Sequence, residues 1–187
     1  MNVYKNMPAL DNGEYALRLT SRTDAGDLLK TYSDEKSVPL FNSDNCHGDD
    51  FHYTTEERML QALDFWTEAY DKGWFVRLSV VDKRSNEVVG TIEGFRREEN
   101  DHFTDCALLR LDLRSDCENR DKIKSILSLI VPKAFDLFGC GMIATKAIPP
   151  AKERIAALLS LGFSRSDLPL IGHDGTEYYD YYEMKRS

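Results

Sequence analysis

The sequence predicts an α/β (α+β) fold in which one mixed central sheet is flanked by helices. Segments whose apolar residues alternate, as in strands, are interspersed with segments whose apolar residues recur every three to four positions, as on one helix face. Their order is strand, helix, helix, three strands, helix, strand, helix, strand. This order mixes hairpins with helical crossovers, so antiparallel and parallel strand pairs are expected in the same sheet.

Composition narrows the class of protein further. The chain has 187 residues, 42% of them hydrophobic, which is enough for the core of a single domain over 1–187. It contains no apolar run of about 18 residues, and its N-terminus lacks a secretion-signal pattern, so a soluble, cytoplasmic protein is expected. The formal net charge of −8 disfavours nucleic-acid binding and mildly favours cationic partners.

The cysteines indicate neither disulfides nor a metal site. They are widely scattered and form no Cys-x-x-Cys pair: Cys46, Cys106, Cys117 and Cys140. Reduced thiols are therefore expected. Five potential metal ligands gather in one segment, Cys46, His47, Asp49, Asp50 and His52. Their spacing matches no zinc motif, so no metal site is predicted.

The first half of the chain begins with a strand over 14–20 and a helix over 23–33. A long polar loop follows over 34–53, of a length that is more often functional than inert. Thr54–Glu57 has a capping-box pattern and begins a helix with a wide apolar stripe. This helix is expected to end near Gly73.

The middle and last parts continue with a hairpin and two further helices. Two strands over 74–82 and 87–95 are joined by a short polar turn, and a third covers 106–113. A helix is expected over 120–138, with Asn119 as its N-cap, Gly139 as its stop and a kink at Pro132. A strand over 142–148 follows. The last two expected elements are a helix from Pro149 to Leu161, ended by Gly162, and a closing strand over 178–184.

The closing strand carries four tyrosines that place two rings on each of its faces: Tyr178, Tyr179, Tyr181 and Tyr182. Core packing and an edge against a second subunit both explain this pattern, so a homodimer is one expectation. Stacking on nucleic acid would need basic neighbours, whereas Asp180 and Glu183 lie among these tyrosines.

The stretch Leu111–Leu127 runs from an apolar strand through a charged turn into an amphipathic helix. A helix N-terminus attracts anions because its first N–H groups are unpaired and the helix dipole is positive there. The stretch thus has the frame of a phosphate-binding loop but none of its glycines. Asp116, Glu118 and Asp121 already crowd this end.

Four segments together resemble the GNAT family of acetyl-CoA-dependent N-acyltransferases: YALRLT with its following helix, DKRSNEVVGTIEGF, LDLRSD and ALLSLGF. The resemblance covers about 14–184 and is greatest to the branch that acetylates the N-terminal residues of ribosomal proteins. It implies acetyl-CoA as co-substrate and direct acyl transfer to a primary amine of a small molecule or peptide in a ternary complex.

The resemblance also implies site residues. The backbone of Leu111, Asp112 and Leu113 would receive the pantetheine arm. Arg120, Lys122 and Lys124 would hold phosphates, and Ile123 would contribute a backbone N–H. Glu93 or Asp105 would accept the proton of the amine. His102 lies in the adjoining turn and is a further candidate base. For each of these three residues, the alternative is an ordinary solvent-facing side chain.

The chain departs from the family pattern at three places. The pyrophosphate-loop pattern falls on 118–123, where none of its signature residues is present. The family's Asn and its general-acid Tyr fall on Ala151 and Leu158. The alternative interpretation is therefore a GNAT-fold protein that has lost catalysis and acts as a ligand-binding or interaction module, in which the charges near Arg120 form an ordinary capped helix terminus.

The acidic loop offers one further hypothesis. In the resembling enzymes, the region between the first two helices helps to form the acceptor pocket. Asp49 and Asp50 would then recruit a cationic amine, and neutralising them should weaken acceptor binding.

Overall fold

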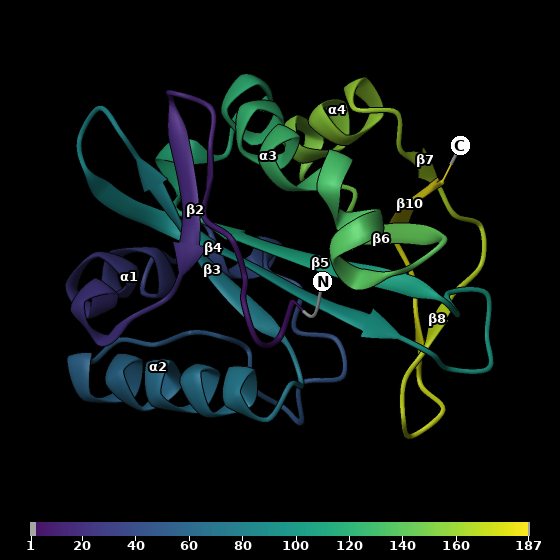
Figure 1. The fold of residues 1–187 in the computed structure, drawn as a ribbon, viewed down its shortest axis with the longest axis horizontal. Helices are drawn as coiled ribbons and strands as arrows, with labels where there is room; N and C mark the ends of the chain where they lie inside the picture. The colour runs from purple at the N-terminus through teal and green to yellow at the C-terminus, as the bar shows by residue number, and fades with distance from the viewer. Residues whose placement is uncertain (1–2, 187) are drawn as a thin grey trace.

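The computed structural model describes residues 3–186, and one sheet organises them (Figure 1). Its strands are β1 (Leu10–Asp11), β2 (Tyr15–Leu19), β3 (Val76–Asp82), β4 (Glu87–Arg97), β5 (Cys106–Leu113), β6 (Met142–Lys146), β7 (Ser164–Arg165) and β10 (Tyr181–Lys185). They lie in the order β1-β2-β3-β4-β5-β6-β10-β7. Only β5 and β6 pair in parallel; the other neighbours are antiparallel. The expected mixed sheet is confirmed.

The described helices lie where local signals predict, although the first and the last are shorter than the ranges expected, 23–33 and Pro149 to Leu161. They are α1 (Ala25–Tyr32), α2 (Glu56–Asp71), α3 (Arg120–Phe138) and α4 (Lys152–Ser160), with short 3-10 turns η1 (Arg22–Asp24), η2 (Val38–Leu40) and η3 (Ser115–Cys117). Thr55 and Asn119 cap α2 and α3 through their side chains, and left-handed Gly139 ends α3. Among the described helices, none is both long and apolar enough to cross a bilayer.

Two helices cover each face of the sheet (Figure 1). Helices α3 and α4 pack their apolar side chains against one face, in the larger core. Helices α1 and α2, with the segment that joins them, make a second core on the other face. The joining segment, 34–53, is not a free loop, because Phe41, Phe51 and Tyr53 are buried in this second core beside Tyr32 and Trp66.

The C-terminal part differs from the expectation. The predicted closing strand over 178–184 is interrupted at Asp180, whose φ of 68° is incompatible with an extended strand. Residues before this break form β9 (Glu177–Tyr178), which pairs with β8 (Leu170–Ile171) in a separate hairpin. Tyr181 is buried and Tyr179 is half exposed, so the tyrosines are not arranged two per face. Alternation alone cannot reveal such a break, because Asp tolerates positive φ and keeps the polar pattern.

The first prediction concerns the substitution of Gly90. This glycine lies where the pairing of β3 and β4 shifts register, and a Cβ at this position would lie 2.1 Å from the carbonyl oxygen of Asp112. Gly90→Ala is expected to lower the free energy of unfolding by about 2 kcal/mol, because backbone of β5 would have to move. Urea denaturation measures this. Gly26→Ala is the control: no atom lies within 4 Å of its Cβ, and alanine favours helix α1, so unchanged or higher stability is expected there. Equal effects of the two substitutions would contradict the close approach.

Candidate functional site

The sheet face under α1 and α2 carries polar side chains beside the apolar core that these helices form. Strand register aligns them across β3, β4 and β5 in two rows, Arg77–Glu93–Arg110 and Ser79–Thr91–Asp112. Directly paired residues on one face of a sheet lie close enough for side-chain contact. The two rows therefore bring ionisable groups from three strands together.

Glu93 lies at the centre of the first row and is 3% exposed. Its carboxylate accepts a hydrogen bond from Nη2 of Arg77 through Oε2, and one of 2.9 Å from Nη1 of Arg110 through Oε1. Burial raises the pKa of Glu93, but the charges and hydrogen bonds of the two arginines outweigh it, so the pKa lies below its usual value. Glu93 is thus an ionised carboxylate between two guanidinium groups.

Asp112 lies behind this group in the second row. Its Oδ2 accepts hydrogen bonds from the hydroxyl of Tyr32 at 2.9 Å and from Nη1 of Arg77 at 3.1 Å. Its Oδ1 is buried with no hydrogen-bond partner. Burial raises the pKa of Asp112, and Arg77 only partly offsets this. The protein therefore stabilises the charge of Asp112 less well than that of Glu93.

This contrast gives the second prediction. Asp112→Asn should change the free energy of unfolding by less than about 1 kcal/mol at pH 7, because the amide oxygen keeps the bonds to Tyr32 and Arg77 while a poorly stabilised charge is removed. Because the folded-state pKa of Asp112 is raised, its carboxyl group stabilises the fold most at low pH, where it is protonated. This stabilisation is lost as pH rises through the folded-state pKa. Urea denaturation of both proteins at pH 4 and pH 7 tests this; a loss of about 3 kcal/mol at pH 7, typical of breaking a buried ion pair, would contradict it.

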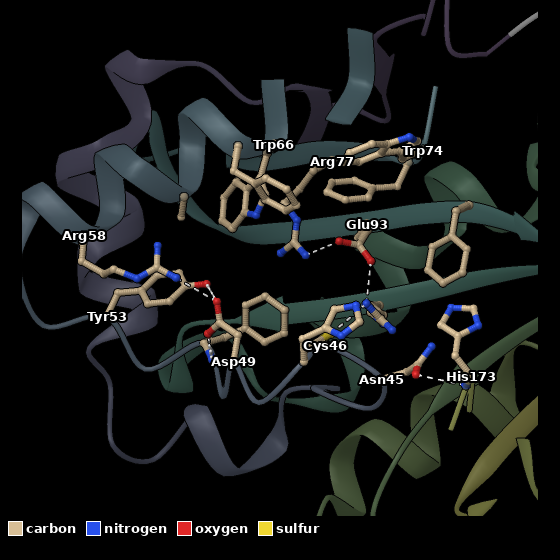
Figure 2. A pocket seen from close by; sticks show the side chains of 17 residues that line it. Asn45, Cys46, Asp49, Tyr53, Arg58, Trp66, Trp74, Arg77, Glu93 and His173 are labelled. Carbon is tan, nitrogen blue, oxygen red and sulfur yellow. Dashed lines mark hydrogen bonds and ion pairs between the residues drawn. The ribbon is translucent and has the colours of Figure 1, made fainter. Parts of the chain in front are cut away.

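A pocket of about 500 Å³ lies over the first row. Figure 2 shows Trp66, Arg77 and Trp74 on one side of it and Cys46 and Asp49 on the other. The complete lining is Asn45, Cys46, His47, Asp49, Phe51, Tyr53, Arg58, Ala62, Phe65, Trp66, Trp74, Phe75, Arg77, Glu93, Phe95, Arg110 and His173. Concave sites with an aromatic wall and a few polar groups are typical small-molecule sites. We take this pocket as the candidate acceptor site.

The acidic residues of the 34–53 segment are already engaged. Asp49 accepts hydrogen bonds from Nη2 of Arg58 at 2.8 Å and from the hydroxyl of Tyr53 at 2.8 Å. Asp50 is exposed, does not line the pocket, and accepts the backbone N–H of His52. Neither carboxylate is arranged to recruit a cationic amine as hypothesised from the sequence.

The two predicted catalytic carboxylates are not brought together. Glu93 lines the pocket, whereas Asp105 lies directly before β5, outside the pocket lining. The Asp105 side chain is 53% exposed and pairs with Arg96, and it also accepts the backbone N–H of Gly141. His102 lies in the same turn and contacts Glu183. Of the predicted bases, the pocket therefore contains Glu93 alone.

The predicted pantetheine-binding edge is the end of β5. Pairing with β6 stops at Leu109–Thr145, so Leu111, Asp112 and Leu113 extend beyond it. The Asp112 side chain faces the polar row, while the Leu111 carbonyl accepts a hydrogen bond of 2.8 Å from Nη1 of Arg154. The edge is thus free of strand pairing but is occupied by a side chain of α4.

The side chain of Arg154 occupies the space beside this end of β5. It is 2% exposed, donates to the Leu40 carbonyl at 3.0 Å and to that of Leu111, and is ion-paired with Glu118. The segment after Leu40 crosses the same region: Asp44 is bonded to Lys146 Nζ at 2.6 Å, and its carbonyl accepts from Arg110. Side chains of α4 and the 34–53 segment therefore fill the space beside the unpaired edge.

The N-terminus of α3 is also occupied by the chain's own groups. The N–H of Arg120 donates to Oε2 of Glu153 at 2.9 Å, and that of Lys122 donates to Oδ1 of Asn119. The N–H of Ile123 donates to the Asn119 carbonyl at 3.0 Å. The N–H group assigned to the cofactor at Ile123 is therefore already used in the first helical bond, in contrast to the expectation.

The basic side chains at this helix end have different surroundings. Nζ of Lys122 donates to the Asp116 carbonyl at 2.9 Å. Arg120 and Lys124 are exposed at the helix surface. They remain available to an anion, and Glu153 shows that a negative group fits beside the N–H of Arg120.

Sequence reasoning missed Arg77, Arg110 and Arg154. For the first two a signal exists: each of β3, β4 and β5 contains two polar residues two positions apart within an apolar strand, a pattern that places them on one face. Arg154 gives no such signal, because a basic residue in the first turns of a helix is normally exposed.

The sequence matches no protein-family model and no curated protein. Solved structures do match. The ribosomal L7/L12 α-N-protein acetyltransferase RimL, in complex with coenzyme A, is 11% identical with a TM-score of 0.72, covering 95% of this chain and 98% of its own. The Vibrio fischeri ribosomal-protein-S5-alanine acetyltransferase is 17% identical with a TM-score of 0.66, covering 96% of each chain.

Two further neighbours extend this group. The microcin C7 self-immunity acetyltransferase MccE, in complex with acetyl-CoA and AMP, is 14% identical, with a TM-score of 0.70 and 94% coverage of each chain. A GNAT-family acetyltransferase from Bacillus anthracis is 13% identical, with a TM-score of 0.67, covering 94% of this chain and 96% of its own. At such identities the likeness establishes the fold, and the chain has the GNAT fold over nearly its whole length.

Proposed function

We propose that this GNAT-fold chain is an acetyl-CoA-dependent N-acyltransferase that acts on a primary amine. The observation that carries the proposal is the position of the pocket. It contains the ionised carboxylate of Glu93, and β5, which supplies Arg110 to its floor, continues directly into the unpaired edge at Leu111–Leu113. Acceptor and acyl donor could therefore meet at one strand. The neighbours in complex with coenzyme A and acetyl-CoA support the same assignment.

The backbone groups at the end of β5 and at the start of α3 have the hydrogen-bonding polarity that coenzyme A needs. At the β5 edge, Arg154 donates to the Leu111 carbonyl, as an amide N–H of pantetheine would. At α3, Glu153 accepts from the N–H of Arg120, as a phosphate oxygen would. Each group is of the polarity that the cofactor presents, so the residues fit it. Binding requires that Arg154 and Glu153 leave these positions.

Arg120, Lys122 and Lys124 would hold the phosphates, and the backbone of Leu111 and Leu113 would hold the pantetheine arm. When bound, acetyl-CoA supplies an acyl group activated as a thioester. Glu93 would orient the acceptor by accepting one of its N–H groups. With its lowered pKa, Glu93 is a weak base, so we assign proton uptake to water beside it rather than to the carboxylate alone. Leu158 is buried and apolar, so it supplies no general acid, and the departing thiolate would take its proton from water.

The remaining assignments rest on composition. A net charge of −8 argues against nucleic acid as a partner. The proposed location is the cytoplasm, and the proposed partners are acyl-CoA and the acceptor amine.

The test is calorimetric titration with acetyl-CoA at low and at high salt, followed by detection of free thiol in the presence of amines. Saturable binding that weakens with salt, followed by amine-dependent thiol release, is expected. Dephospho-CoA, which lacks the 3′-phosphate, is the matched control and should bind more weakly. Binding without transfer, or no binding at millimolar cofactor, would reject the enzyme and favour a GNAT-fold binding module.

A further inference from the structure

We infer that the pocket takes an amine whose attached group is aromatic and carries no positive charge, such as an aromatic amino-acid amide or the N-terminus of a peptide that begins with an aromatic residue. This inference rests on the proposed function for the role of the amine as acceptor. The selection itself follows from the pocket's walls and charges, which act on any bound amine.

The walls are aromatic from the floor to the mouth. The rings come from the 34–53 segment, α2, the connection between α2 and β3, and β4: Phe51, Tyr53, Phe65, Trp66, Trp74, Phe75 and Phe95. Phe65 and Trp74 are 49% and 53% exposed, with ring centroids 6.4 Å apart. Large apolar side chains left this exposed beside a cavity favour contact with an apolar ligand.

The charges of the pocket disfavour a cationic side chain. Its lining contains three arginines, Arg58, Arg77 and Arg110, against two carboxylates. Both carboxylates are already ion-paired, Asp49 with Arg58 and Glu93 with the other two. A further positive charge would therefore meet no free carboxylate in the lining and would lie beside guanidinium groups.

An aromatic wall can also bind cations through its ring faces. Here, however, the chain's own cations already lie over these faces. The guanidinium carbon of Arg58 lies 4.2 Å from the ring centroid of Tyr53, and that of Arg77 lies 4.2 Å from Trp66. Nζ of Lys72 lies 4.6 Å from the Trp74 ring. These three rings already contact a cation of the chain itself, so apolar contact is the main interaction that the aromatic wall offers a ligand.

The pocket contains its own reporter, because the chain has two tryptophans and both line it. We would titrate the protein with phenylalaninamide, leucinamide and lysinamide without acetyl-CoA and follow tryptophan fluorescence. Phenylalaninamide should bind at least about tenfold more tightly than lysinamide, with leucinamide between them. Tighter binding of lysinamide, or no response to any of the three, would overturn the inference.

Two variants separate the walls from the charges. Phe65→Ala should weaken the binding of phenylalaninamide about fivefold and leave the binding of lysinamide unchanged. Tyr179 is also half exposed but lies outside the pocket lining, so Tyr179→Ala should change neither affinity. Arg58→Gln frees Asp49 and should strengthen lysinamide binding. Arg22→Gln breaks a comparable exposed pair with Asp64 elsewhere and should not.

These outcomes can be told apart from those of the proposed function. Aromatic selectivity without acetyl-CoA binding would uphold the pocket's specificity and reject the enzyme. Acyl transfer to lysinamide in preference to phenylalaninamide would uphold the enzyme and reject the specificity.

Discussion

Replacing Glu93 with glutamine is expected to lower the free energy of unfolding by about 3 kcal/mol at pH 7. Glu93 is buried between Arg77 and Arg110, and removing one partner of a buried ion pair leaves its counterpart uncompensated, which typically costs about 3 to 5 kcal/mol. The lower value applies because Asp112 remains beside Arg77 and its charge would be better stabilised once Glu93 is neutral.

The pH dependence of this loss follows from the direction of the pKa shift. The folded-state pKa of Glu93 lies below its ordinary value of 4.5, so the carboxylate stabilises the fold above the unfolded pKa, and this contribution disappears as pH falls through the folded one. The difference between wild type and Glu93→Gln should therefore be constant from pH 7 to about 5 and shrink below pH 4.5.

Urea denaturation over this pH range measures the effect. Glu87→Gln is the matched control, since Glu87 lies on the same strand but forms its ion pairs at the surface, and little change is expected there. A Glu93→Gln protein as stable as wild type at pH 7 would show that the buried row contributes nothing to the fold.

Changing the charge of Glu153 is expected to strengthen acetyl-CoA binding. Glu153→Gln should do so about tenfold and Glu153→Lys about a hundredfold, because the carboxylate takes the N–H of Arg120 and repels a phosphate in the same place. Coulomb's law gives about 1 to 4 kcal/mol for unit charges 4 Å apart near a protein surface, and 1.4 kcal/mol is tenfold in affinity.

Calorimetry at low salt measures these affinities, and the gain should shrink as salt is added. Glu153 is exposed, so the substitutions should leave the fold intact. Glu57→Gln, an exposed acid on α2, removes the same net charge elsewhere and should have little effect. Equal gains from Glu57→Gln and Glu153→Gln would mean that only net charge matters and that α3 does not receive the phosphates.

Local signals in the sequence predicted most elements closely. Strand β5 and helix α3 have the bounds expected from alternation and from the cap and stop residues Asn119 and Gly139. Such signals act within one turn or one strand, so they can be identified without the rest of the molecule. The break at Asp180 and the short strands β1, β7 and β8 were not identified, because two-residue pairings carry no period.

The candidate site was likewise predictable only in part from the sequence. The sequence by itself determined the fold class, the position of Glu93 on an apolar strand and the charged start of α3, since these depend on neighbouring residues. Only the tertiary structure decided that Arg77 and Arg110 flank Glu93, that Asp105 lies apart from it, and that Arg154 and Glu153 occupy the ends of β5 and α3. Those contacts join residues far apart in the chain, and strand register and helix docking fix them. No local pattern encodes which distant side chain will compensate a buried charge or an unpaired backbone group.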